Sequence, residues 1–306
     1  MNLNYNMSKL LVILGPTATG KTKFAVKLSS IYNGEIISAD SRQIYKGMNI
    51  GTGKDLDEYN YNNKIIPYYL IDILNPEKNY SVFQFKNDFF KSYDIINKNN
   101  NLPILCGGTG FYIESVLLNY DMPHVGPNEI LRKDYEKKNI DELINILVTL
   151  DETMYDKEFH VTKRRIIRTI EIISSNYKKQ NTSQRNIDNP LIIGLQLERS
   201  KVLEKIKLRL HQRLSSGMVE EVEALINKGM TFERLKYFGL EYKFIGKYLF
   251  NEIDYDTMVE KLNFAINQFS KRQMSFFRRM EKRGLTIHWI SPKDDTLARE
   301  LIDNYL

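Results

Sequence analysis

Residues 15–22 read GPTATGKT, which matches the G-x-x-x-x-G-K-[ST] pattern of a phosphate-binding loop. An apolar run, KLLVIL, precedes the loop and a helix-like run, KTKFAVKLSS, follows it, which is the context that the pattern requires. The loop amides and Lys21 can hold a phosphate, and the Thr22 hydroxyl can bind magnesium. The motif therefore predicts a P-loop for a diphosphate or a triphosphate such as ATP, made of Gly15, Pro16, Thr17, Ala18, Thr19, Gly20, Lys21 and Thr22.

Short apolar runs rich in β-branched residues recur along the chain, at residues 10–14, 35–38, 68–74 and 102–106. Helix-length segments separate the first two runs and the last two, and this alternation predicts an α/β fold built on a parallel sheet. Two further runs, at residues 191–197 and 285–290, can return to the same sheet.

The stretch between the fourth and fifth runs has a different character. Helical patterns at residues 129–138, 141–150 and 163–173 end in a polar stretch at residues 174–190, which we expect to be mobile. We therefore expect a P-loop parallel-sheet core, residues 1–118 and 191–306, interrupted by a mainly helical insertion at residues 119–190. A long helix at residues 200–215 is expected to end at Gly217.

Composition limits the partner and the compartment. The net charge is +6, which favours a polyanionic partner, although a lysine- and asparagine-rich composition alone would also produce it. Cys106 is the only cysteine, which excludes a disulfide framework and fits a reducing compartment; we expect it to be a buried filler. No apolar run reaches the roughly 18 residues of a membrane span, so we expect no membrane association and a cytoplasmic location.

Two segments follow predicted strands at the edge where open α/β sheets bind ligands. Asp40 follows the run at residues 35–38, and three roles stay open for it: a magnesium ligand, a general base, or a cap of the next turn. The run at residues 102–106 ends in GGTG, which either brings backbone close to a ligand with the Thr109 hydroxyl exposed or is only a tight turn.

Basic residues gather on three predicted helices. The helix at residues 163–173 has an isoleucine stripe, so its arginines face outward, either to solvent or to a partner. On the predicted helix at residues 200–215, Lys205, Arg209 and Arg213 follow one another at i, i+4 steps. Repulsion between such neighbours costs a few tenths of a kcal/mol per pair, and a bound anion would relieve it. Residues 268–283 carry six basic residues with phenylalanines between them. The pattern fits contacts with RNA phosphates and bases, or phenylalanines that pack in the core.

Five segments occur in a characteristic order: GPTATGKT, SADSRQIYKGMNIGTGK, GGTGFYIE, RRIIRTIEI and SKRQMSFFR. With them, the chain resembles the bacterial tRNA dimethylallyltransferases over almost its whole length. The resemblance implies transfer of a dimethylallyl group from dimethylallyl diphosphate to the exocyclic amine of the adenosine 3′ of the anticodon, with release of diphosphate. It also implies a P-loop domain with a helical insertion and a grip on the tRNA anticodon stem-loop, and we expect a monomer with magnesium as cofactor.

By position, the resemblance makes Asp40 the base, and Thr22 and Arg209 the residues that hold the leaving diphosphate, with Thr22 on magnesium. It implies tRNA contacts at Asp40, Ser41, Arg42, Gln43, Thr109, Arg132, Arg164, Arg165, Ile166, Ile167 and Arg168. The chain departs from the family pattern at residues 160–162, at His211 and Arg213, and in the turn at residues 239–243. Two alternatives remain: a P-loop nucleotide kinase or NTPase, and a non-catalytic RNA-binding module.

Overall fold

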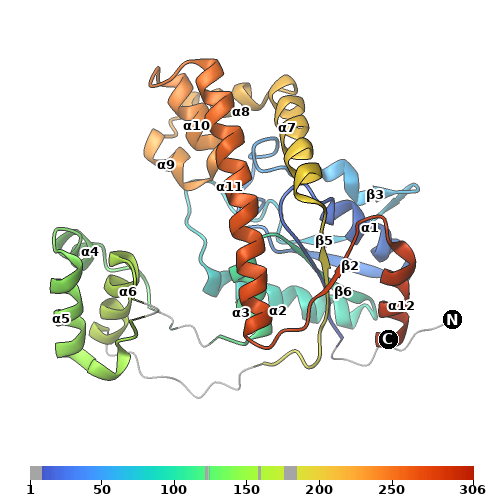
Figure 1. The fold of residues 1–306 in the computed structure, drawn as a ribbon, viewed down its shortest axis with the longest axis horizontal. Helices are drawn as coiled ribbons and strands as arrows, with labels where there is room; N and C mark the ends of the chain where they lie inside the picture. Colours follow the sequence, from blue (N-terminus) through green and yellow to red (C-terminus); the bar gives the residue numbers. More distant parts are fainter. Residues whose placement is uncertain (1–8, 121–122, 124, 158–159, 176–184) are drawn as a thin grey trace. The chain divides into compact units, whose positions relative to one another are not determined.

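The computed structural model describes residues 9–120, 123, 125–157, 160–175 and 185–306 (Figure 1). The chain divides into two compact units. The core unit comprises residues 1–119 and 186–306, and the inserted unit comprises residues 120–185. In the described part of the chain, no helix has the length and apolar character that a membrane crossing requires.

A six-stranded parallel sheet forms the centre of the core unit. Its strands, in spatial order, are β5 (Tyr68–Tyr69), β2 (Gly34–Ser38), β6 (Leu102–Gly107), β1 (Leu11–Leu14), β7 (Leu191–Leu195) and β8 (His288–Ile290) (Figure 1). A separate hairpin pairs β3 (Asn60–Tyr61) with β4 (Lys64–Ile65), next to the short helix η1 (Leu56–Tyr59). The expected α/β class and parallel sheet are confirmed.

Helices cover both faces of this sheet. Successive side chains of a strand point to opposite faces, so Leu11 and Ile13 share one apolar cluster with α1 (Lys21–Tyr32) and α12 (Asp295–Tyr305). Val12 and Leu14 share the other with α2 (Val82–Lys98) and α3 (Gly110–Leu117). The strand residues are fully buried on both sides, which is why these strands read as continuous apolar runs in the sequence.

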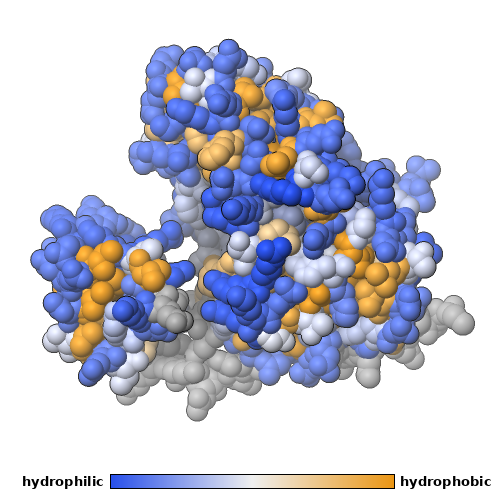
Figure 2. Space-filling view, in the orientation of Figure 1, coloured by the Kyte–Doolittle hydropathy of each residue, from blue (hydrophilic) through white to orange (hydrophobic). Residues whose placement is uncertain are grey.

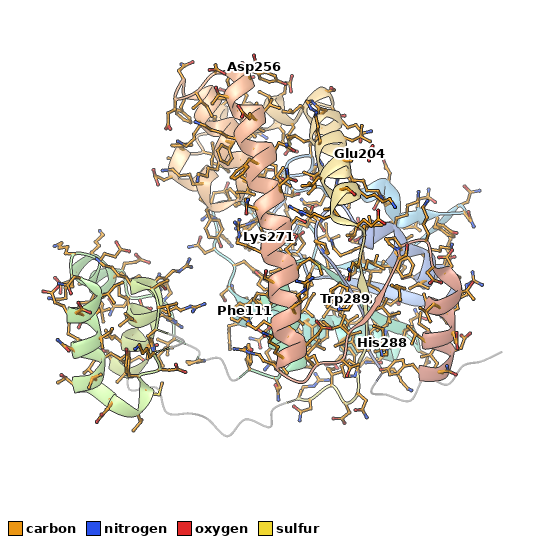
Figure 3. The ribbon with its side chains drawn as sticks, in the orientation of Figure 1. Phe111, Glu204, Asp256, Lys271, His288 and Trp289 are labelled. Atoms are coloured by element: carbon orange, nitrogen blue, oxygen red, sulfur yellow. The ribbon has the colours of Figure 1, made fainter. Side chains whose placement is uncertain are left out.

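The second half of the core unit adds a helical layer: α7 (Arg199–Ser215), α8 (Met218–Asn227), α9 (Phe232–Tyr237), α10 (Leu240–Leu249) and α11 (Tyr255–Lys282). Gly217 has a positive φ of 94° directly after α7, as expected for a helix stop. The end of α11 is connected to the sheet by Trp289 of β8, which Figure 3 labels, because its indole donates to Glu281 at 2.9 Å. The buried Glu114 of α3 also pairs with Arg279 and Arg283.

The inserted unit contains α4 (Glu129–Tyr135), α5 (Ile140–Asp151), η2 (Glu152–Met154) and α6 (Lys163–Ser174). Its core is small: Ile166, Ile167 and Ile170 of α6 bury against Leu143 and Leu147 of α5. Asn139 and Glu142 cap α5 reciprocally through side-chain and backbone hydrogen bonds.

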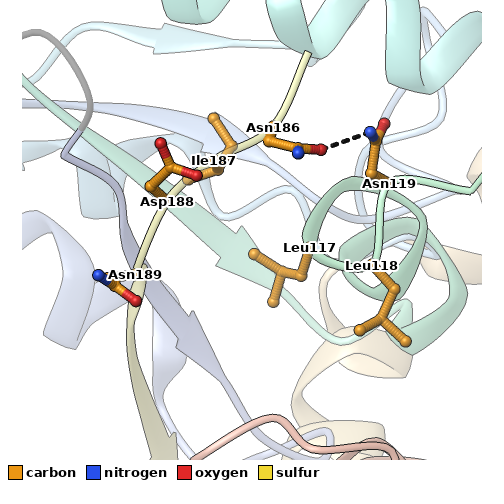
Figure 4. Close-up of a pocket in the computed structure, with 7 residues that line it drawn as sticks. All are labelled: Leu117, Leu118, Asn119, Asn186, Ile187, Asp188 and Asn189. Carbon is orange, nitrogen blue, oxygen red and sulfur yellow. Dashed lines mark hydrogen bonds between the residues drawn. The ribbon is translucent and has the colours of Figure 1, made fainter. Parts of the chain in front are cut away.

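The inserted unit is shorter than the range of residues 119–190 expected from the sequence. Asn119 donates to Asn186 where the chain leaves and re-enters the core unit, and Ile187 packs on the core (Figure 4). A pocket of about 420 Å³ lies at this junction, lined by Leu117, Leu118, Asn119, Asn186, Ile187, Asp188 and Asn189. Of the polar stretch expected to be mobile, residues 176–184 lie outside the described residues.

Candidate active site

Three loops meet at the carboxyl edge of the sheet. The P-loop follows β1, Asp40 follows β2, and the GGTG turn follows β6, which lies between those two strands. Because the strands are parallel, their carboxyl ends lie at the same edge. The structure therefore brings the sequence-predicted P-loop, Asp40 and Thr109 together.

Two side chains of the P-loop donate hydrogen bonds to one backbone carbonyl of the same loop. Lys21 Nζ donates to the carbonyl of Pro16 at 2.8 Å, and the hydroxyl of Thr19 donates to the same carbonyl at 2.9 Å. Burial lowers the pKa of Lys21 to about 8, while Cys106 and Asp40 raise it and Arg209 lowers it further. In the described structure no carboxylate accepts a hydrogen bond from this partly buried ammonium, and a phosphate oxygen would supply the missing negative charge.

Gln273 of α11 joins the P-loop to the GGTG turn. Its Oε1 accepts from the backbone N–H of Thr17 at 2.8 Å, and its Nε2 donates to the carbonyl of Gly108 at 2.9 Å. A Cβ at Gly108 would lie 2.5 Å from that Nε2, so a side chain there would break the contact. No role was predicted for Gln273, although it lies within the SKRQMSFFR segment.

The carboxylate of Asp40 makes one turn contact and leaves one oxygen available. Its Oδ1 accepts from the backbone N–H of Arg42 at 2.9 Å, and among the described residues Oδ2 has no hydrogen-bond donor. The cap-like contact is therefore present, and it does not exclude a role as base. Thr109 fixes the same turn, because its Oγ1 accepts from the N–H of Ser41 at 3.1 Å.

Arg42 and Gln43 also have contacts within the core unit. The Arg42 guanidinium lies 5.3 Å from the ring centroid of Tyr237. Gln43 Nε2 donates to the carbonyl of Gly53 at 3.0 Å, and its Oε1 accepts from Ser38 at 3.2 Å. Gln43 therefore connects the strand edge to the segment at residues 49–55.

The segment at residues 49–55 connects the carboxyl edge of the sheet to α7 and α8. Glu221 of α8 accepts from three successive backbone N–H groups, those of Asn49 and Ile50 at 2.8 Å and that of Gly51 at 3.0 Å. At the far end of the segment, Arg209 Nη2 donates to Asp55 at 2.6 Å. A Cβ at Gly53 would lie 2.8 Å from Arg209 Nη2, and Gln43 of the sheet edge binds the carbonyl of Gly53, so the predicted diphosphate-holding arginine reaches the segment bound to this edge; its charge also lowers the pKa of Lys21.

Cys106 lies in β6 beneath the P-loop. Its side chain is buried, and burial raises the pKa of its thiol to about 12. A thiol of this kind is not a nucleophile near neutral pH, so the expectation of a buried filler is confirmed.

A basic surface runs along α11. Lys271, Arg272, Arg278 and Lys282 are exposed on it, and Figure 2 shows strongly hydrophilic residues over the visible side of this helix. Phe277 is fully buried, and Phe269 is 41% exposed. The phenylalanines of this segment are thus divided between the core and the surface.

In the inserted unit, the predicted arginines fall into two classes. Arg132 binds the buried Glu171 through Nε at 2.7 Å and Nη2 at 2.9 Å, and Arg168 binds it through Nη1 at 3.1 Å. Burial alone would raise the pKa of Glu171, but the donors Arg132 and Arg168 outweigh burial and lower it. Arg164 and Arg165 are instead exposed on the outer side of α6.

Ile166 and Ile167 are two of the residues at which the resemblance implies a tRNA contact. Ile166 is fully buried and Ile167 is 4% exposed, both in the apolar cluster of the inserted unit. These side chains hold α6 on its neighbours and leave Arg164 and Arg165 at the surface. In the described part of the chain, no group of three acidic, histidine or cysteine side chains could hold a metal ion.

The sheet, the loop after β1 and the helical insertion define a P-loop protein of the α/β class. The chain matches the family model described as IPP transferase over residues 43–280, and the one described as isopentenyl transferase over residues 8–71. It belongs to the IPP transferase family.

Proteins of the same family are similar over nearly the full chain. The chain is 48% identical over 294 residues to "tRNA dimethylallyltransferase 1" of Parabacteroides distasonis, which covers 95% of this chain and 94% of the relative. It is 43% identical over 299 residues to "tRNA dimethylallyltransferase 2" of Trichlorobacter lovleyi, covering 97% of each.

Solved structures agree with the fold. The full-length tRNA isopentenylpyrophosphate transferase of Bacillus halodurans superposes with a TM-score of 0.69 at 28% identity, covering 97% of this chain and 94% of that one. A eukaryotic dimethylallyltransferase acting on tRNA superposes with a TM-score of 0.78 at 21% identity, covering 96% and 78%. The second likeness concerns the fold alone.

Proposed function

We propose that this enzyme transfers a dimethylallyl group from dimethylallyl diphosphate to the exocyclic amine of the adenosine 3′ of the anticodon in tRNA. The observation that carries the proposal is the meeting of the P-loop, Asp40 and Arg209 at one sheet edge. The P-loop and Arg209 can hold a diphosphate leaving group, and Asp40 can serve as the base that a nucleophilic amine needs. Relatives named tRNA dimethylallyltransferase, 40–48% identical to this chain, support the same reaction.

The leaving group is held by the P-loop. As the bond between the allylic carbon and the diphosphate oxygen breaks, its electron pair passes to the diphosphate, and negative charge builds on that group. The loop amides, Lys21 and Arg209 are placed to stabilise this charge, and oriented donors of this kind are commonly the largest catalytic contribution. No covalent enzyme intermediate is needed.

Asp40 is the proposed base. The lone pair of an adenine amine is delocalised into the ring, so the amine attacks well only as its proton is removed. In the proposed step the new bond joins the amine nitrogen to the allylic carbon, and the proton passes to Asp40 Oδ2, the oxygen without a donor in the described structure. The target adenosine must leave the base stack to reach this edge.

The residues present fit a magnesium ion. In P-loop sites magnesium is bound by one hydroxyl together with phosphate oxygens and waters, so a cluster of acidic side chains is not required. Thr22 would hold the ion, which would supply further charge stabilisation for the diphosphate. Both substrates, tRNA and the prenyl donor, are found in a cell's interior, so we propose that the enzyme acts in the cytoplasm. We also propose that it is a monomer.

We propose that tRNA is bound by both units. In the core unit the contacts are Asp40, Ser41, Arg42, Gln43 and Thr109, which share the sheet edge. In the inserted unit we propose Arg164 and Arg165 as the main phosphate contacts, because both are exposed on α6, whereas Arg132 and Arg168 are partly buried beside Glu171.

The decisive experiment incubates the protein with unmodified tRNA, dimethylallyl diphosphate and magnesium, then analyses the nucleosides by mass. We expect adenosine that carries one five-carbon group. Steady ATP hydrolysis without prenyl transfer would instead indicate the kinase or NTPase alternative. Tight RNA binding without any turnover would indicate the RNA-binding module.

A further inference from the structure

Two arginines of α7, not one, reach the segment at residues 49–55. Arg209 and Arg213 are four residues apart, so they lie on the same side of the helix. Their Nη2 atoms lie 2.6 Å and 3.9 Å from the same oxygen, Oδ2 of Asp55. A Cβ at Gly53 would collide with both guanidinium groups, so the missing side chain of this residue makes room for the pair.

Arg213 is the arginine whose hydrogen bonds are incomplete. Its side chain is 16% exposed, and its Nη2 is buried without a hydrogen-bond partner among the described residues. Leaving a buried charged donor unsatisfied is costly, so such a group needs an explanation, and a bound ion or ligand that accepts from it is one.

The surrounding charges are mixed. Burial lowers the pKa of Arg213 and so does Arg209, whereas Glu241 and Asp55 oppose them. Burial also raises the pKa of Glu241, and Arg213 opposes that effect. The arginine pair is therefore only partly neutralised by the protein.

A diphosphate could replace the carboxylate of Asp55 at the two arginines. Its side chain is 45% exposed, and the hydrogen bond from Arg209 is the one that its carboxylate makes in the described structure. A diphosphate carries more negative charge than one carboxylate and has more acceptor oxygens, so it would satisfy both guanidinium groups at once.

We propose that Arg213 is a second diphosphate-binding arginine of this enzyme, and that Asp55 occupies the arginine pair until the diphosphate displaces it. The inference rests on the proposed function, because it requires a diphosphate in the P-loop next to Arg209. Arg213 then binds the leaving group together with Arg209, and Asp55 acts as an internal competitor.

The test measures the Kd of inorganic diphosphate with magnesium present, by calorimetry, for the full-length protein and its variants. Arg213→Met keeps the unbranched apolar stem of the side chain and removes the charged guanidinium. We expect the Kd to rise about 10-fold to 100-fold, as for loss of a hydrogen bond to a charged group. Lys207→Met is the matched control, since it removes one positive charge from an exposed position of α7 outside the row of Arg209 and Arg213, and its Kd should equal that of the wild type.

Two further variants complete the test. Arg213→Lys keeps the charge without the planar fork, so its Kd should lie between those of the wild type and Arg213→Met, and it replaces the latter if that variant does not fold. Asp55→Asn removes the competitor, so it should bind diphosphate more tightly than the wild type.

The results separate this inference from the function on which it rests. A wild-type protein that does not bind diphosphate overturns both. A wild-type protein that binds it, with Arg213→Met or Arg213→Lys at the wild-type Kd, overturns the role of Arg213 alone. Unchanged or weaker binding by Asp55→Asn overturns the displacement of Asp55.

Discussion

Asp40 offers the sharpest test at the scale of a single residue. Asp40→Asn keeps the oxygen that accepts from Arg42 N–H, but it removes the basic carboxylate. Positioned acid–base groups contribute about 10²–10⁴ in rate, so the single-turnover rate of prenyl transfer should fall by roughly that factor. Donor affinity and melting temperature should change little.

The same measurements distinguish the other roles of Asp40. A magnesium ligand would show weaker donor binding that excess metal partly restores, and a cap would show a lower melting temperature with the rate kept. Asp57→Asn, the same change at an exposed position of η1, is the control and should leave the rate unchanged. A near-wild-type rate for Asp40→Asn would exclude the base.

The buried ammonium of Lys21 predicts a pH dependence of donor binding. Its pKa is about 8 without ligand, and a bound diphosphate must raise that pKa because it favours the charged form. Affinity is therefore greatest below about pH 8 and is lost as the pH rises toward the higher pKa of the bound state. The check is the donor Kd between about pH 7 and about pH 9.5.

Lys21→Arg provides the comparison for this effect. Its guanidinium stays charged over the whole range, so any affinity that it retains should vary less with pH than that of the wild type. A wild-type Kd that does not change with pH would show that Lys21 keeps its proton throughout.

At the scale of elements, Glu221 determines where the segment at residues 49–55 lies. Glu221→Gln keeps the size of the side chain, but it replaces acceptors of three backbone N–H groups and of the Tyr242 hydroxyl. Because hydrogen bonds to a charged group are strong, we expect a loss of about 1–3 kcal/mol in unfolding free energy and weaker donor binding. Urea unfolding and donor calorimetry measure the two effects.

Glu220→Gln is the matched control, because Glu220 is the preceding residue of the same helix and is exposed. It should change neither stability nor donor binding. If Glu221→Gln loses stability but binds the donor as the wild type does, the segment at residues 49–55 does not help to form the donor site.

Elements that are determined by a short stretch of sequence could be predicted. The P-loop, β1 and α7 were found from periodicity and from the motif, and their bounds differ from the expected ones by one residue. The strand expected at residues 68–74 was wrong in length, since only Tyr68–Tyr69 pairs with β2. Leu70 and Asp72 have positive φ angles of 62° and 54°, which an apolar run does not reveal.

Contacts between distant segments could not be predicted. Gln273 lies 256 positions from Thr17, and Glu221 lies 170 to 172 positions from the backbone that it holds. Local periodicity carries no information about such pairs. The pairing of Arg132 and Arg168 with one buried glutamate was missed for the same reason, since the helical pattern shows only that these arginines are off the apolar stripe.

At the scale of the whole molecule, the inserted unit predicts a salt dependence of tRNA binding. Replacing the exposed Arg164 and Arg165 by alanine should weaken tRNA binding and reduce the slope of log K against log salt by about two, one per lost phosphate contact. The melting temperature should stay the same. Filter binding at several salt concentrations measures the slope.

The control removes the same charge elsewhere in the inserted unit. Lys133 and Lys137 are exposed, and replacing both by alanine should leave the slope nearer to that of the wild type. Equal slopes for the two double variants would mean that net charge, not the position on α6, sets tRNA affinity.

The order of the strands also determines the order in which a growing chain can fold. Strand β1 lies at the centre of the sheet between β6 and β7, and β7 is translated only after the whole inserted unit. The small core of the inserted unit uses residues from its own stretch of chain alone. We expect protease protection of the inserted unit in ribosome-bound chains that end before β7, and protection of the sheet only in longer ones. The inserted unit is then complete on the ribosome before the second half of the core unit has been translated.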